Sequence, residues 1–198
     1  MTRTLTPKGE QTRRRIVSGA AAELRERGVD EVRLEDVMAR TGTSKSQLFH
    51  YFPDGKEGLL LAVVQQEADQ VLADQEPYLS HLTSWEAWGK WRDRVVDRYV
   101  SQGDRCPLRG LLGDTGRRAP AARAVLTGLM DQWQAALATG IRQMQESHDI
   151  SDTIDATRAA AGLIAGIQGG VLLLSNTGRT EYLESAVDLA IDGLKRGA

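Results

Sequence analysis

Hydrophobic residues recur at intervals of three and four along most of the chain, which is the spacing of one face of an α-helix. The first such segment covers about residues 10–27. Ile16 and Leu24 share its apolar face, and Gly28 is suited to end it as a left-handed cap. No run of alternating β-branched residues predicts a strand. The pattern therefore predicts an all-α protein.

The same period, together with residues that favour helix ends, predicts seven further helices. They cover about residues 34–41, 44–52, 56–75, 83–102, 120–147, 151–176 and 180–195, with one more short helix after Cys106-Pro107. Ser44, Thr83, Ser151 and Thr180 are the expected N-terminal caps. Pro120 suits the first turn of its helix because a proline there loses no helical hydrogen bond.

The helices at 34–41 and 44–52 are joined by a short turn that contains Gly42, which is the helix-turn-helix arrangement. Each is shorter than the ~12–15 residues at which an isolated helix becomes marginally stable. They therefore need a shared core, which Leu48 and Phe52 are expected to close. The predicted boundary separates residues 1–56 from residues 57–198, and the helix that begins at Lys56 would belong to both parts.

The outward face of the second of these helices carries side chains that can hydrogen-bond to base edges and phosphates. These are Lys45, Ser46, Gln47 and His50, with Phe49 and Tyr51 at the borders and Lys56 beyond the turn. Such a face predicts a DNA-reading helix in the major groove. The alternative is an ordinary helical surface, since helix-turn-helix shapes recur in proteins that bind no DNA.

The balance of charged residues also changes at the predicted boundary between residues 56 and 57. Residues 1–56 hold eleven Lys or Arg against eight Asp or Glu, whereas the remainder holds fourteen against nineteen. A basic N-terminal part gives weak support to a polyanionic partner. The single cysteine, Cys106, allows no intramolecular disulfide and fits the reducing cytoplasm.

Catalytic and metal-binding patterns do not stand out. The three histidines lie far apart, so no metal site is predicted. We find no phosphate-binding glycine loop and no nucleophile or zinc motif, so we expect no cofactor and no enzymatic activity. The longest apolar run, residues 159–174, is shorter than the ~20 residues of a membrane span and predicts a buried core helix rather than a membrane segment.

Two features of the second part suggest binding surfaces. Gly162, Gly166 and Gly170 are four residues apart, and each costs a helix ~1 kcal/mol relative to alanine. They predict a closely packed dimer interface, although a ligand pocket or a tight monomer core would explain them too. An aromatic stripe forms either core or a pocket for a flat apolar ligand. The candidate ligand-binding residues are Trp88, Trp91, Tyr99, Cys106, Trp133 and Gln168.

Residues 13–60 resemble the DNA-binding domain of the TetR family of transcriptional regulators. The residues that fall on the family pattern are Val37, Ala39, Gly42, Ser44, Leu48, Phe49, Tyr51, Phe52, Lys56 and Leu59. The residues that this resemblance implies as DNA contacts are Thr43, Ser44, Lys45, Ser46, Gln47, Phe49, Tyr51 and Lys56. Arg33 stands where most members have a capping threonine, and it can still reach a phosphate. FPDGK and the later Cys106-Pro107 resemble the subgroup of multidrug-resistance repressors typified by LmrA and YxaF.

The resemblance implies a three-helix DNA-binding domain and a larger helical domain that binds a small ligand and dimerises. The expected function is that of a homodimeric repressor, released from double-stranded operator DNA by a small apolar effector. The alternative is a helical small-molecule-binding or enzymatic bundle with a vestigial N-terminal domain. A gel shift with the gene's own upstream DNA would separate the two.

Overall fold

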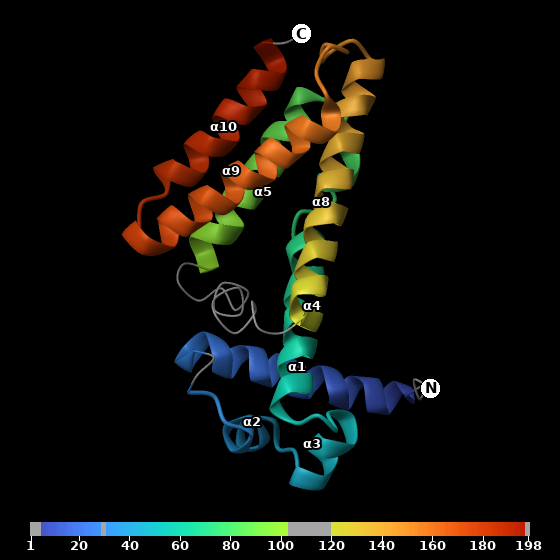
Figure 1. Ribbon diagram of the computed structural model, residues 1–198, viewed down its shortest axis with the longest axis vertical. Coiled ribbons are helices and arrows are strands. Elements are labelled where there is room, and N and C mark those ends of the chain that lie inside the picture. Colours follow the sequence, from blue (N-terminus) through green and yellow to red (C-terminus); the bar gives the residue numbers. More distant parts are fainter. Residues whose placement is uncertain (1–4, 29–30, 103–119, 197–198) are drawn as a thin grey trace. The chain divides into compact units, whose positions relative to one another are not determined.

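The computed structural model describes residues 5–28, 31–102 and 120–196 of the chain (Figure 1). In these ranges all regular structure is helical, which confirms the predicted all-α fold. The helices are α1 (Pro7–Arg27), α2 (Leu34–Thr41), α3 (Lys45–Tyr51), α4 (Lys56–Ala73), the 3₁₀ turn η1 (Leu79–His81), α5 (Trp85–Gln102), α8 (Pro120–Glu146), α9 (Ala156–Thr177) and α10 (Glu181–Arg196).

The chain forms two compact units. Among the described residues, the first unit contains the chain up to Asp69 and residues 120–126, and the second contains residues 70–102 and 127–196. The division falls inside α4 and again inside α8, so each of these continuous helices contributes to both units. The two functional domains expected at residues 1–56 and 57–198 stay a prediction.

The first unit is built around the apolar face of α1. Ile16, Ala20 and Leu24 are buried there, together with Val37 of α2 and Leu48 of α3. Two helices as short as α2 and α3 are stabilised by this common core rather than by their own backbone hydrogen bonds. Their apolar sides therefore point inward, and this leaves the other side of α3 exposed.

Local chemistry sets where the short helices begin and end. The Ser44 hydroxyl accepts a hydrogen bond from the Gln47 amide at 3.2 Å, so Ser44 caps α3 as expected. Gly42 ends α2 with a φ of 58°, a left-handed conformation that glycine adopts without a steric penalty. Together these residues fix the turn between α2 and α3.

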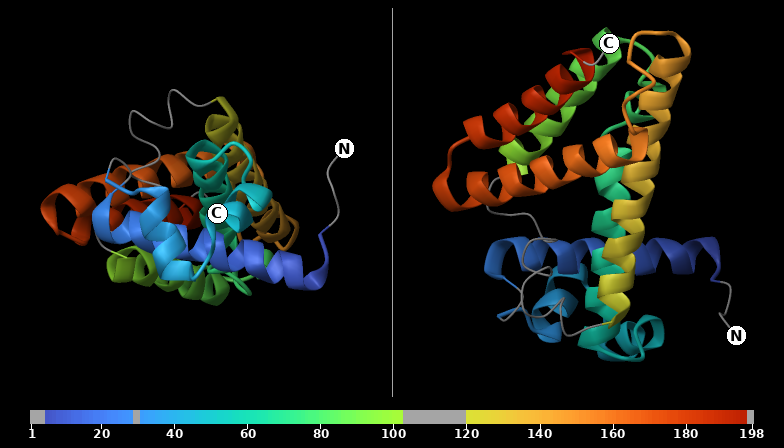
Figure 2. Two further views of the ribbon diagram at one scale, coloured as in Figure 1. Left: turned by 90° about the horizontal axis from the view of Figure 1, so that it is seen from below. Right: turned by 45° about the horizontal axis from the view of Figure 1, so that its top comes forward.

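In the second unit α9 and α10 run side by side (Figures 1 and 2), and α5 also packs against α10. Gly170 makes this approach possible, because a Cβ at that position would lie 2.5 Å from the Cα of Leu183. Arg92 of α5 also donates hydrogen bonds of 2.8 and 2.9 Å to the Asp188 carboxylate of α10. These contacts bury the inward sides of all three helices.

Some predicted helix starts are wrong, because a neighbouring side chain supplies the cap. Ser84 rather than Thr83 caps α5, since its hydroxyl accepts from the Ala87 amide. Asp155 rather than Ser151 caps α9, and its carboxylate accepts from two backbone amides. The helix start expected at residue 10 lies at Pro7. The short helix expected after Cys106-Pro107 lies outside the described residues.

Candidate nucleic-acid interface

The exposed side of α3 brings together most of the predicted DNA-contacting residues. Those with exposed side chains are Arg33, Ser44, Lys45, Ser46, Gln47, Phe49 and His50. Tyr51 and Lys56 are half-buried. The surface thus offers the ammonium groups of Lys45 and Lys56, the guanidinium group of Arg33 and several hydrogen-bonding groups, which suits the phosphates and base edges of a duplex.

Thr43 is a correction to this set. Its side chain is only 5% exposed, and its hydroxyl forms a 2.8 Å hydrogen bond with the Thr41 hydroxyl. The Thr41 hydroxyl also lies 2.7 Å from the Val37 carbonyl oxygen. Because Thr43 is held inside the turn, its side chain is not available to DNA and serves to pack α2 against α3.

Aromatic rings border the polar side of α3. Phe49 is 39% exposed, and one edge of its ring lies beside Gly55, where a Cβ would be 3.4 Å from the ring. His50 and Tyr51 meet edge to face at 5.0 Å between ring centroids. Phe52, by contrast, is buried in the core as predicted. The exposed ring of Phe49 can make apolar contact with sugars or with a thymine methyl group.

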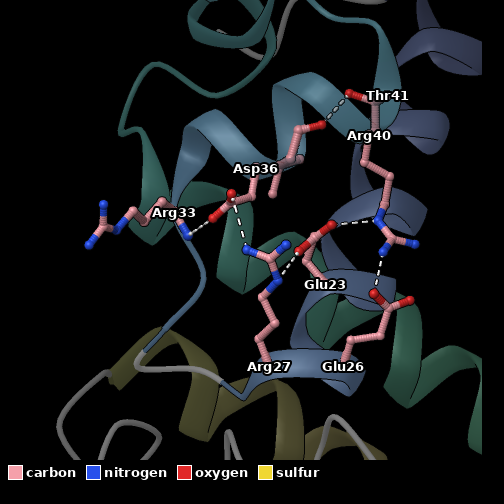
Figure 3. A network of polar contacts seen from close by, with 8 residues as sticks. Glu23, Glu26, Arg27, Arg33, Asp36, Arg40 and Thr41 are labelled. Atoms are coloured by element: carbon pink, nitrogen blue, oxygen red, sulfur yellow. Dashed lines mark hydrogen bonds and ion pairs between the residues drawn. The ribbon is translucent and has the colours of Figure 1, made fainter.

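A network of ion pairs clamps α2 to α1 (Figure 3). Glu23 is its centre and is only 3% exposed. Its carboxylate accepts a 2.6 Å hydrogen bond from Arg40 near the end of α2, and it lies 3.2 Å from Arg27 on its own helix. Arg40 also pairs with Glu26. These two hydrogen-bonded carboxylates raise the pKa of Arg40 above the usual value of an arginine.

The same network reaches the start of α2. Arg27 lies 3.1 Å from the Asp36 carboxylate, which also accepts the backbone N–H of Arg33 at 3.3 Å. A guanidinium has no acceptor atom, so the cap of α2 comes from Asp36 and not from the Arg33 side chain. Figure 3 shows the Arg33 side chain extending away from the network. Both ends of α2 are therefore fixed to α1, and with them the orientation of the turn that carries α3.

Sequence reasoning missed this network. The Asp three residues after Arg33 was a readable signal for a helix start. The pairing of Glu23 with Arg40 was not readable, because seventeen residues separate them and only the packing of α1 on α2 brings them together.

The predicted ligand-binding residues lie in the second unit, apart from Cys106, which is outside the described residues. Trp88, Trp91, Trp133 and Tyr99 are all buried, and Gln168 is half-buried. Trp91 donates a 2.8 Å hydrogen bond to Gln75, and its ring meets that of Trp88 edge to face. Among the described residues, the indole N–H groups of Trp88 and Trp133 are buried without an acceptor.

The predicted dimer glycines have different surroundings. Gly170 is buried against Leu183 of the same chain, so its assignment to the dimer interface is wrong. Its close contact packs one helix pair. Gly166 is half-buried with a Cβ position 3.5 Å from the Ala186 side chain. Gly162 is exposed with open space around it. The dimer role of Gly162 and Gly166 stays a prediction.

A helix-turn-helix that exposes the polar side of its second helix defines a class of DNA-binding proteins. The profile described as "Bacterial regulatory proteins, tetR family" matches residues 16–63, and that of "Tetracyclin repressor-like, C-terminal domain" matches residues 85–190. The second match alone covers more than half of the chain. The chain belongs to the TetR family of transcriptional regulators, and it is a DNA-binding transcriptional repressor with a C-terminal ligand-binding domain.

Known relatives agree with this assignment. An uncharacterized HTH-type transcriptional regulator of Mycobacterium tuberculosis is 27% identical over 174 residues, which cover 79% of this chain and 84% of the relative. A TetR transcriptional regulator from Chloroflexus aurantiacus is 25% identical, with a TM-score of 0.78 over 94% of this chain and 96% of that one. A putative TetR-family regulator from Mesorhizobium loti has the same TM-score at 18% identity, over 96% and 97%. Proteins of this family are regulators and not enzymes.

Proposed function

We propose that this repressor binds a pseudo-palindromic operator as a homodimer and leaves it when a small, largely apolar ligand binds. The observation that carries the proposal is the division of α3 into a buried side with Leu48 and an exposed polar side. A dimer presents two such helices, and the two-fold symmetry of the protein requires matching half-sites about 34–36 Å apart.

Different residues of the interface have different roles in this proposal. Lys45 and Gln47, in the first turn of α3, read base edges. Arg33 and Lys56 stand at the starts of α2 and α4 and hold phosphates. Base contacts supply specificity, whereas phosphate contacts supply affinity that falls with added salt.

The exposed side of α9 supports the dimer. This helix is apolar and long enough to span a membrane by length and composition, yet only 33% of its most apolar window is buried. Its exposed residues include Ala161, Gly162, Ala165, Gly169, Leu172 and Leu173, and Leu189 of α10 is 64% exposed. An apolar surface of this kind favours a protein partner. Because the family consists of DNA-binding regulators, we assign it to a second copy of the chain and place the protein in the cytoplasm.

The buried indole groups support a ligand with a hydrogen-bond acceptor. An indole N–H can only donate, and a buried donor without a partner costs about 1–3 kcal/mol. A carbonyl, ether or carboxylate oxygen on an aromatic or aliphatic frame would satisfy Trp88 or Trp133 and bury its apolar part among the neighbouring rings. The α4 helix belongs to both units, so it is the proposed lever between ligand and DNA.

The test combines three measurements. A gel shift with the gene's own upstream DNA should give a specific complex, and light scattering at micromolar concentration should give a dimer. Ligand affinity, followed by tryptophan fluorescence, should then fall about 5–150-fold when operator is bound, because coupling is reciprocal. Equal ligand affinities with and without operator would contradict release by ligand. No specific complex with any upstream or genomic DNA would contradict operator binding, and it would revive the alternative of a ligand-binding bundle, which the family match does not favour.

A further inference from the structure

The two halves of α1 differ in whether their cationic side chains form ion pairs. In the second half, Arg25 pairs with Glu67 of α4, and Arg27 pairs with Glu23 and Asp36. The first half contains four cations with exposed side chains, which are Lys8, Arg13, Arg14 and Arg15. Within the described residues none of these four forms an ion pair, and the acidic residue of this half is Glu10 alone. Four uncompensated cations on one helix indicate an anionic partner from outside the chain.

The first half of α1 lies beside α3. A Cβ at Gly9 would be 3.6 Å from the Tyr51 hydroxyl, and the Arg13 guanidinium lies over the Phe52 ring, 5.4 Å from its centroid. These contacts place the N-terminal turns of α1 next to the C-terminal end of the helix that faces DNA. A duplex bound by α3 would thus continue past these turns.

The four cations do not all point the same way. One stripe along the helix contains Lys8, Arg15 and Gly19, because Arg15 follows Lys8 by seven residues and Gly19 follows Arg15 by four. A Cβ at Gly19 would collide with the side chain of Thr41, at the end of α2. This stripe is therefore on the side of the helix-turn-helix. Arg14 lies one turn before Ser18, whose hydroxyl hydrogen-bonds Gln66 of α4, so Arg14 is on the flank that faces α4, about 100° around the helix from Arg15.

We propose that Lys8 and Arg15, the α1 cationic face, bind phosphates of the duplex next to the groove that α3 enters. The inference rests on the proposed operator binding and extends the interface to a helix outside the helix-turn-helix. Exposed Lys and Arg side chains without internal carboxylates neutralise phosphates at the lowest cost, because no ion pair has to break. Contacts of this kind carry no base information and lengthen the footprint.

The test compares Arg15→Gln and Lys8→Gln/Arg15→Gln with the matched control Arg14→Gln, which removes the same charge from the adjacent position. Affinity is measured by fluorescence anisotropy at several salt concentrations, on a long operator duplex and on one trimmed to the two half-sites. Each phosphate contact contributes about 0.9 to the slope of log K against log salt. Arg15→Gln should lower the slope by about that amount per subunit and the double variant by about twice as much, whereas Arg14→Gln should leave it unchanged. Trimming the duplex should weaken binding by the wild type and abolish the difference in affinity between the wild type and the double variant.

Two controls keep the outcomes distinct. Arg15→Lys keeps the charge and should keep the slope, which a purely structural role of Arg15 would not predict. Equal slopes for the double variant and Arg14→Gln, or a loss that persists on the trimmed duplex, would overturn the proposal. If the wild type forms no specific complex on the long duplex, the proposed operator binding fails instead.

Discussion

The exposed side of α3 is polar, whereas the exposed side of α9 is apolar. Each helix buries one apolar side in its own unit, around Leu48 in α3 and around Leu163 and Ile167 in α9. The side left over is polar and charged in α3, whereas in α9 it holds alanines, glycines and Leu172. A helix in water normally has one apolar side, so the second apolar side of α9 needs a partner and the polar side of α3 does not need one to stay folded.

The contrast distinguishes two kinds of binding. Duplex DNA is recognised by hydrogen bonds and charges that are satisfied by water until DNA replaces it, so the α3 surface can exist free or bound. An apolar surface is stabilised only while it is covered. In the proposed function, the protein is therefore a dimer both on and off DNA. The following changes test the two surfaces separately.

Charging the apolar side of α9 should have the largest effect. In the variant Leu172→Arg with Leu189→Arg, each dimer would bury four cations without partners, at a large desolvation cost. We expect dimerisation to weaken at least about 100-fold, or roughly 3 kcal/mol, and operator affinity to fall with it. Sedimentation equilibrium measures the change. Val100→Arg on α5, another exposed apolar position, is the control and should leave the dimer intact. A dimer of unchanged affinity in the double variant would assign the interface elsewhere.

Two adjacent glycines separate the two sides of α9. Gly170→Ala would force α9 and α10 apart and should lower the free energy of unfolding by about 1–3 kcal/mol. Gly169→Ala meets nothing within 4 Å and should raise it by up to ~1 kcal/mol through helix propensity. Urea unfolding of both variants in the charged, monomeric background removes the contribution of the dimer. Similar losses in the two variants would mean that the spacing of α9 and α10 does not depend on Gly170.

Truncation of a base-reading side chain should affect one sequence position. Gln47→Ala should cost ~1–3 kcal/mol on the preferred operator and little on random DNA. Thr43→Val is the comparison, because its hydroxyl is buried and bonded to Thr41. That variant should lose stability in thermal unfolding while keeping the operator preference. A change in base preference for Thr43→Val but not for Gln47→Ala would reverse the assignment drawn from burial.

Loss of a phosphate contact should have the smallest effect and be independent of sequence. Lys56→Ala should weaken binding by a similar factor on operator and random DNA and reduce the salt slope by ~1 per subunit. Binding isotherms between low and physiological salt measure both quantities. A loss confined to the operator would give Lys56 a role in reading bases.

Much of the fold follows from local chemistry that the sequence displays. The apolar period predicts the helices, Gly42 and Ser44 mark the turn, and Phe52 falls on the buried side of its helix. These features depend on residues within one or two turns of each other. The caps of α5 and α9 were predicted at the wrong residues, because Ser84 and Asp155 compete with nearby residues that have the same hydrogen-bonding ability.

What the sequence by itself determined is the all-α class, the helix-turn-helix and the polar side of α3, because helical period and capping act over a few residues. Only the tertiary structure decided that Thr43 is buried, that Gly170 packs within its own chain and that Glu23 joins Arg40. Period alone shows that residues share a helix side, but it does not show which neighbour covers that side. That choice depends on how helices distant in sequence pack, and their packing is set by side-chain shape and charge across the whole unit.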